Sequence, residues 1–294
     1  MARPPARALA LLAALTLVWG TNWPLFRIAL DSLTVWTFRA GVLIAATLML
    51  FAIVAIRRES FAVPKGRWPA LIAASILNVG IWGITTALAV LYIPSGHASV
   101  LAYTMPLWVA LLGFALFRQT LTPRMLAALA LGAAAVGALM IPNFAGYADA
   151  PLGLLFGLLA GFCWALGTFV MKRTDWGGMK MSLTFWQILI SAVPGVTLAL
   201  LIDGLPREWP PLPSLVSMIY TGVVPMALGT AIWFALVALL PTQVAALASI
   251  TVPMVAVASG VLILSEPLSA LQAGALACSV ASLWLALMPA RGKT

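Results

Sequence analysis

Apolar residues run along this chain in long blocks, separated by short breaks in which polar and turn-forming residues gather. A helix needs about 20 mainly apolar residues to cross a bilayer core about 30 Å thick, and the blocks have this length. The breaks carry turn residues, for example Pro64 to Gly66 and Gly177 with Gly178. The pattern predicts an all-α polytopic membrane protein with ten transmembrane helices, at residues 8–30, 34–56, 68–91, 95–117, 122–142, 152–173, 179–202, 213–237, 242–264 and 267–289.

Composition strengthens this interpretation and excludes other classes of protein. The chain is 63% hydrophobic and 8% charged, whereas soluble domains are roughly half apolar and about a quarter charged. The loops are too short to hold a separate catalytic domain, so a soluble enzyme is excluded. The net charge of +9 is scattered over short loops and not clustered, so we expect no nucleic-acid partner. Cys163 and Cys278 both lie in apolar runs, which predicts no disulfide framework, no metal site and no cofactor.

The positions of the cations predict the orientation. Arg3 and Arg7 precede an apolar run without a small-residue cleavage site, so we expect a retained first helix and not a signal peptide. Loops that stay in the cytoplasm carry the excess of Lys and Arg. With the N-terminus inside, 13 cations fall on the cytoplasmic side and 3 on the other, namely Arg27, Arg39 and Arg207. Both termini are therefore predicted to be cytoplasmic.

The second half of the sequence repeats the first. Trp19 aligns with Trp164 and Arg27 with Lys172 at an offset of 145 residues. The segment from Pro94 through Leu121 matches the one from Pro241 through Leu268 at an offset of 147. Residues 1–146 and 147–294 are therefore predicted to be two five-helix repeats, and because five is odd, the second must be inverted. Inverted repeats suit alternating access in transporters, although a channel can also be built from them.

Several short motifs resemble a known family of transporters. They are Trp19-Gly20-Thr21-Asn22, Phe38-Arg39, the run from Tyr92 through Ala98, Pro253, and Glu266 through Ser269 with Gln272. Together they resemble the drug/metabolite transporter superfamily of EamA type over essentially the whole chain, with the closest likeness to YddG-type exporters of aromatic and other neutral amino acids. Gln119 and Ala128 depart from the common Glu and Gly. The resemblance implies ten helices and export across a bacterial inner (plasma) membrane.

Polar and aromatic residues near mid-span are the candidates for the transport pathway, because polar groups there are costly unless they face a cavity or a partner. The predicted substrate-binding residues are Trp19, Asn22, Asn78, Trp82, Thr85, Tyr103, Trp164, Thr168, Trp233 and Ser249. Plain helix packing is the alternative for the aromatic members, and a bond to the preceding turn is the alternative for the hydroxyls. Rings, amides and hydroxyls without fixed charge predict a neutral solute with an aromatic or apolar body.

Charged and conformationally special residues refine this expectation. Arg39 lies close to the outer end of its helix, and we expect it to snorkel to the interface. All seven carboxylates lie in loops or at helix ends, which favours a facilitator without strong proton coupling. His97 is a candidate proton sensor because its ordinary pKa is about 6.5, with a hydrogen-bonding role at a helix end as the alternative. Pro106 and Pro253, at matching positions, are predicted to kink their helices and to act in gating.

The function classes can be ranked on these features. The first hypothesis is a carrier for neutral, mainly aromatic or apolar, amino acids, working in the lipid bilayer as a monomer, with a homodimer as the alternative. A multidrug exporter of lipophilic cations would need a membrane-embedded carboxylate. An integral membrane enzyme on lipids would need clustered Asp, Glu or His, so we predict no enzyme activity. A passive channel would be distinguished by its lack of saturation and counterflow.

Overall fold

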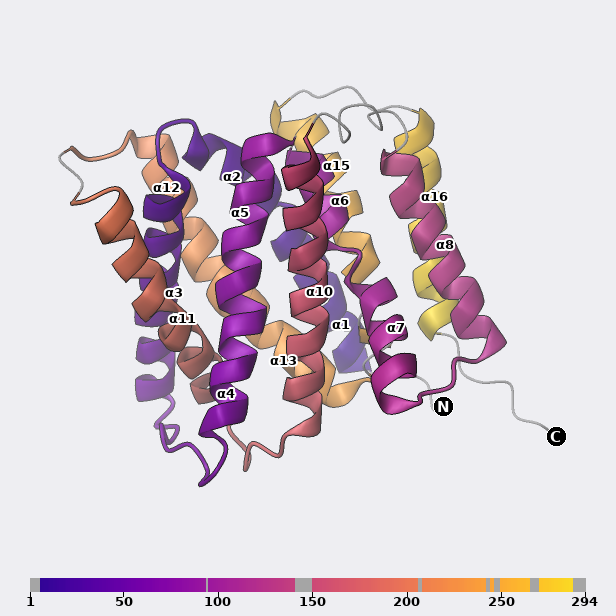
Figure 1. Cartoon of the computed structure of the whole chain (residues 1–294), viewed down its shortest axis with the longest axis horizontal. Coiled ribbons are helices and arrows are strands. Elements are labelled where there is room, and N and C mark those ends of the chain that lie inside the picture. The colour runs from indigo at the N-terminus through magenta and orange to yellow at the C-terminus, as the bar shows by residue number, and fades with distance from the viewer. Residues whose placement is uncertain are drawn as a thin grey trace.

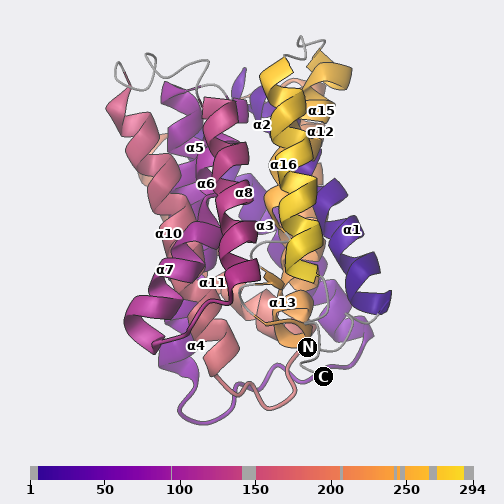
Figure 2. The same ribbon diagram turned by 90° about the vertical axis from the view of Figure 1, so that its right-hand side faces the viewer.

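The protein is a bundle of helices. The structure, a computed structural model, describes residues 6–93, 95–140, 150–205, 208–241, 244–245, 249–264 and 270–287. These residues form helices and loops and include no strand. The long helices lie side by side and run between the same two ends of the molecule (Figures 1 and 2).

Seven helical stretches are long and apolar enough to cross a membrane. They are Ala6–Leu30 (α1, Ala6–Gly20, and α2, Asn22–Leu30), Val35–Ile56 (α3), Trp68–Tyr92 (α4, Trp68–Ser75; η1, Ile76–Ile81; α5, Trp82–Tyr92), Ala98–Phe117 (in α6, Ser95–Ala102, and α7, Met105–Phe117), Pro151–Arg173 (α10), Met181–Ile202 (α11) and Leu212–Leu239 (α12, Leu212–Thr221; η3, Gly222–Gly229; α13, Thr230–Leu239). The other three predicted spans coincide with α8 (Pro123–Met140), with η4 (Ser249–Thr251) followed by α15 (Val252–Leu264), and with α16 (Ala270–Leu287). The all-helical, multi-pass prediction is confirmed, whereas the count of ten spans stays a prediction.

The two ends of the bundle are distinguished by their charged residues. We call the end that carries Arg7, Arg57 and Lys180 the N-side end, and the end that carries Asp31 and Asp203 the far end. Between them the outer surface is apolar, with side chains such as Leu48, Phe114 and Leu262 exposed. Such a surface is stable against lipid and not against water.

Several spans are interrupted where the sequence disrupts regular α-helix. The first span breaks between Gly20 and Asn22, because the ring of Pro24 would clash with the carbonyl of Gly20 one turn earlier. The third and eighth spans each contain a π-helical stretch, η1 and η3, and Pro225 lies inside η3. Such widened turns are frequent at functional sites, because they leave backbone groups available to other partners.

Helices α3 and α11 pack against each other along their length, and each is capped by a carboxylate that follows the other. Glu59, just after α3, accepts bonds from the backbone N–H of Met181 and Ser182 at the start of α11, at 3.0 and 3.3 Å. Asp203, just after α11, accepts bonds from the backbone N–H and the hydroxyl of Thr37 at the start of α3, at 3.0 and 2.7 Å. Anionic groups stabilise helix N-termini, so these caps hold the pair together at both ends.

Glycines allow α10 to pack closely on its neighbours. A Cβ atom at Gly157 would lie 2.6 Å from the Cβ of Leu101, and one at Gly161 would lie 3.0 Å from the carbonyl oxygen of Ala102. The small residues of α10 therefore serve contacts within the chain. Helices α8 and α16 form a separate pair at one side of the bundle (Figures 1 and 2), where the Ser282 hydroxyl donates to the Ala128 carbonyl at 2.6 Å.

Candidate substrate pathway

An aromatic pocket lies inside the bundle, where the first span meets α3, α5, α10 and η3. Its volume is about 420 Å³, which includes space at its opening. Its side chains approach so closely that only a water-sized molecule fits without rearrangement. The lining residues are Trp19, Asn22, Trp23, Phe26, Arg39, Val42, Trp82, Tyr103, Trp164, Thr221, Pro225, Met226 and Thr230.

Tryptophan rings from three spans line this pocket, and the ring of Trp233, from a fourth span, packs behind them. The ring centroid of Trp164 lies 5.5 Å from that of Trp19, 5.0 Å from that of Trp82 and 6.1 Å from that of Trp233. These tilted and edge-on arrangements are the ones that aromatic quadrupoles favour. The Trp19 indole N–H also donates to the Pro225 carbonyl at 3.0 Å, and Gly229 leaves room for the Trp19 ring.

Polar groups lie on the side of the pocket formed by the first and eighth spans, where Thr221 and Thr230 flank η3. The Asn22 side-chain oxygen accepts a bond from the Thr221 hydroxyl at 2.9 Å. Thr230, at the start of α13, is buried against the same space. A solute in this pocket would therefore meet rings on most sides and a few hydrogen-bonding groups on one.

Arg39 brings a fixed charge into the pocket, which corrects the expectation of an uncharged site. Its side chain is 5% exposed and does not snorkel to the interface. One guanidinium N–H group donates to the Thr86 hydroxyl at 2.7 Å, while Nε finds no acceptor among the described atoms. The guanidinium carbon lies 4.7 Å from the Phe26 ring centroid and 5.9 Å from that of Trp82. Arg39 also lines a neighbouring pocket of about 510 Å³ between α3, α5 and α11.

The structure brings five of the ten predicted substrate-binding residues into the pocket, namely Trp19, Asn22, Trp82, Tyr103 and Trp164. Asn78, Thr85, Thr168, Trp233 and Ser249 are buried outside its lining. The amide of Asn78 faces Gly167, and its side-chain nitrogen and oxygen have no partner among the described atoms. Thr85 and Thr168 donate to the carbonyls of Ile81 and Trp164 one turn back, which is the packing alternative for hydroxyls.

The predicted gating residues lie at breaks in the chain. Pro106 stands in the first turn of α7, directly after the break that ends α6, and Pro253 stands in the first turn of α15, directly after η4. A helix interruption is therefore present before each proline, while the gating role stays a prediction. The backbone of His97 belongs to α6, but its side chain lies outside the part of the chain that the structure describes.

A wide vestibule opens at the N-side end. It encloses about 1270 Å³ and is lined by four cations, Arg7, Arg57, Lys172 and Lys180, together with residues of α10, α11 and α13. The Lys172 ammonium donates to the carbonyl oxygens of Val237 at 2.6 Å and Leu240 at 3.2 Å. It thereby caps the C-terminus of α13, where a cation is favourable.

The vestibule and the aromatic pocket approach each other along α13. Thr230 lines the pocket, and Ala231 and Phe234 line the vestibule. Trp233, on the same helix, is fully buried and lines neither space. The Trp233 ring packs 5.8 Å from that of Trp19. The rings of Trp19, Trp164 and Trp233 thus contact one another at the side of the pocket where α13 continues toward the vestibule.

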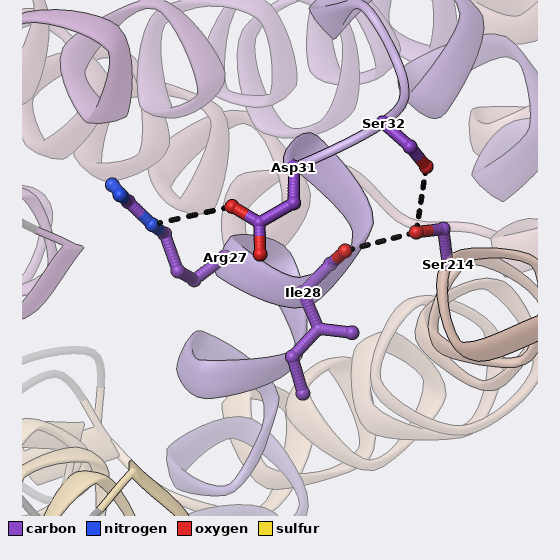
Figure 3. A network of polar contacts seen from close by, with 5 residues as sticks. All are labelled: Arg27, Ile28, Asp31, Ser32 and Ser214. Atoms are coloured by element: carbon purple, nitrogen blue, oxygen red, sulfur yellow. Dashed lines mark hydrogen bonds and ion pairs between the residues drawn. The ribbon is translucent and has the colours of Figure 1, made fainter. Parts of the chain in front are cut away.

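At the far end a polar network joins α2 to α12 (Figure 3). The Ser32 hydroxyl donates to that of Ser214 at 2.7 Å, and Ser214 donates to the Ile28 carbonyl at 3.0 Å. Beside it, Arg27 pairs with Asp31 at 3.6 Å. These contacts hold the first and eighth spans together on the side opposite the vestibule.

Comparison with known families identifies the class of protein. The profile of the EamA-like transporter family matches residues 6–141 and again residues 151–288. The chain belongs to the EamA-like transporter family. The resemblance seen in the sequence motifs is thereby confirmed, and this EamA-like chain is a multi-pass membrane transporter and not a member of an enzyme family.

Related proteins carry transporter names. An uncharacterized transporter of Bacillus subtilis, YvbV, is 27% identical, and the alignment covers 90% of this chain and 87% of YvbV. A protein of Escherichia coli named "probable amino-acid metabolite efflux pump" is 28% identical over 87% of this chain and 86% of its own length. A solved crystal structure with 18% identity superposes with a TM-score of 0.79 over 97% of this chain and 98% of its own. That likeness establishes the fold of the EamA-like chain.

The carboxylates of this EamA-like transporter lie away from the pathway wherever the structure describes them. Asp31, Asp175, Asp203 and Glu208 are exposed, and Glu59 is half-buried in its capping position. The remaining two, Asp149 and Glu266, fall outside the described residues. Within the described part, Arg39 is thus the one ionisable group with a formal charge that lines the aromatic pocket.

Proposed function

We propose that this chain exports small neutral metabolites, foremost aromatic and other apolar amino acids, by alternating access. The observation that carries the proposal is the ring-walled pocket buried between spans from both halves of the chain. Rings stack on an apolar side chain, and nearby hydroxyls and amides orient a polar end. The Escherichia coli relative is named as a probable efflux pump, which supports export as the direction of transport. We place the monomer in the bilayer of a bacterial inner membrane, with both termini cytoplasmic.

Several features support the proposal that residues 1–146 and 147–294 are inverted five-helix repeats. The family profile matches once in each half. The π-helical stretches η1 and η3 lie in the third and eighth predicted spans, at corresponding positions. Glu59 and Asp203 make reciprocal caps on the second and seventh spans, at opposite ends of the molecule. Such pseudo-symmetry allows two halves to exchange conformations and to expose a central site to each side in turn.

The arrangement of spaces suggests a route. With the N-terminus inside, the vestibule faces the cytoplasm. A solute would approach through it to the contacting rings of Trp19, Trp164 and Trp233. Entry into the aromatic pocket requires the tryptophans to separate, and release requires the α2–α12 network at the far end to open. Because no described carboxylate is buried along this route, we propose a facilitator that runs down the gradient of its substrate.

Counterflow in proteoliposomes tests this function. Purified full-length protein is reconstituted, loaded with unlabelled amino acid, and exposed to a panel of labelled amino acids and cationic dyes. We expect saturable counterflow of aromatic and large apolar amino acids and none of the dyes. Counterflow of the dyes alone would establish a multidrug exporter instead, and linear uptake without counterflow would establish a channel.

A tryptophan pair provides the matched control for the site. Trp164→Ala removes a ring that contacts three other tryptophans in the pathway, whereas Trp284→Ala removes a ring that is 61% exposed on α16. We expect the first change to abolish counterflow and the second to leave it intact. Equal transport by both variants, with both folded by size-exclusion chromatography, would remove the pocket from the pathway.

A further inference from the structure

Arg39 lines the aromatic pocket and carries a positive charge that no anionic side chain pairs with among the described residues. The guanidinium is buried, and within the described residues it makes no ion pair and one side-chain hydrogen bond, to Thr86. Its Nε atom, which carries a proton, has no acceptor there. A guanidinium has five N–H donors in a fixed fork, so most of its binding capacity is unused in this conformation.

Leaving such a group unpaired is costly. Moving a charge out of water carries a penalty that only a partner charge or good hydrogen bonds offset. The rings of Phe26 and Trp82 offset part of it through their negative faces, but rings supply no oxygen for the free N–H groups. A buried polar group without a partner at a cavity is a place for a ligand.

The position of Arg39 connects it with the aromatic pocket. Phe26 and Trp82, the rings that lie over its guanidinium, line the pocket themselves. An anion bound to the free N–H groups would therefore lie beside the rings that hold the apolar part of the same molecule. The planar fork of arginine matches the two oxygens of a carboxylate, with two parallel hydrogen bonds.

We propose that Arg39 binds the carboxylate of the transported solute, so that the carboxylate is required for recognition and an amino group is not. The described pocket residues supply no anion for an ammonium group, and the Asn22 oxygen is already engaged by Thr221. The site therefore takes aromatic and apolar monocarboxylates, of which amino acids are one kind. This inference rests on the proposed function and defines its substrate class by the carboxylate instead of by the amino acid as a whole.

Four phenyl compounds of similar size test the proposal on the wild-type protein in proteoliposomes and by ligand-induced thermal stabilisation. They are phenylalanine, 3-phenylpropionate, phenylalaninamide and phenethylamine. We expect the two carboxylates to bind and to exchange, and the amide and the amine to bind about 30-fold more weakly or worse. Equal binding of all four would overturn the carboxylate inference and leave the export proposal standing. No binding of any of them would overturn both.

Variants assign the selectivity to Arg39. Arg39→Gln should lose the preference for acid over amide, whereas Arg39→Lys should keep part of it, because an ammonium is a point charge without the fork. Arg58→Gln makes the same change at an exposed arginine outside both spaces and should retain wild-type selectivity. Retained acid preference in a folded Arg39→Gln protein would overturn the role of Arg39. If that variant does not fold, the binding of the four compounds to the wild-type protein and to Arg39→Lys still tests the proposal.

Discussion

Lys172→Met should shift the balance between the two conformations that the proposed alternating access requires. In the present conformation, with the vestibule open at the N-side end, the Lys172 ammonium bridges α10 to the end of α13 through the Val237 and Leu240 carbonyls. Methionine keeps the length and the apolar stem but cannot donate to either oxygen. The substitution therefore weakens a contact that belongs to this conformation.

The proposed repeat indicates what the opposite conformation would contain. The offset of 145 residues matches Lys172 with Arg27, and the offset of 147 matches Val237 and Leu240 with Val90 and Ile93. Arg27 now pairs with the exposed Asp31 at 3.6 Å (Figure 3). It donates no side-chain hydrogen bond to the third span among the described residues. We expect it to move to those carbonyls when the far end opens.

The size of the shift follows from the bonds that are lost. A hydrogen bond to a charged group contributes about 1.5–3 kcal/mol, and the partial exposure of Lys172 reduces this toward the lower end. A loss of about 1.4 kcal/mol changes the ratio of the two conformations about tenfold. Lys172→Met should lower the share of the vestibule-open form by this ratio, and Arg27→Met should raise it.

Accessibility labelling measures the ratio. In a protein with Cys163 and Cys278 replaced by Ala, Ala235→Cys places a thiol in the vestibule lining, where an impermeant maleimide reacts in inside-out vesicles. Lys172→Met should slow this reaction, and Lys180→Met, which removes a vestibule cation without a described carbonyl bond, should not. An unchanged rate in Lys172→Met, or a change of the same sign in Arg27→Met, would refute the idea that Lys172 caps α13 in one conformation and Arg27 caps the third span in the other.

Three further predictions concern packing, gating and coupling. Gly161→Ala should lower the apparent melting temperature in detergent, because overpacking against Ala102 costs about 1–3 kcal/mol and outweighs about 1 kcal/mol of helix propensity. Gly137→Ala, with no atom within 4 Å of the added Cβ among the described residues, should raise it slightly. Replacing Pro106 and Pro253 by Ala should slow transport and alter labelling, and unaltered rates in both would remove them from gating. An imposed membrane potential should leave the accumulation of a zwitterionic amino acid unchanged. If each transport step moved one net charge, a potential of about 100 mV would shift the free energy of accumulation by about 2.3 kcal/mol.

The sequence predicted the helices and the aromatic part of the pocket because both follow from local pattern. Runs of apolar residues fix where a span can lie, and the mid-span position of Trp19, Trp82 and Trp164 indicated that they face inward. Pocket lining was harder to predict along the third span. Asn78 and Trp82 are four residues apart and should share a face of an α-helix, yet Trp82 lines the pocket and Asn78 faces Gly167. Asn78 lies within the π-helical η1, which ends at Ile81, directly before Trp82. The π-helical turns change the angular step per residue, which a period of 3.6 does not anticipate.

The position of Arg39 in the pocket was not predicted, for a different reason. Distance from the helix end indicated that the side chain was able to snorkel, but it does not say toward which neighbour the helix face is turned. Packing against Phe26 and Thr86 turns that face inward, and these contacts come from other spans. A charged residue inside a predicted span is itself a signal of function, and this signal indicates more about Arg39 than its distance from the helix end.

The two halves of the pocket are alike in their rings and unlike in their polar groups. Trp19 and Trp164 correspond by the offset of 145, and both contribute to the wall of rings. With α3 and α11 aligned at their first residues, Val35 and Met181, Arg39 corresponds to Phe185, which packs in the core between these helices. The proposed conformational exchange would then depend on the symmetric rings and caps, whereas the proposed carboxylate recognition depends on Arg39, which has no charged counterpart in the second half. If both proposals hold, a substitution at Arg39 changes substrate preference and leaves the alternating access intact.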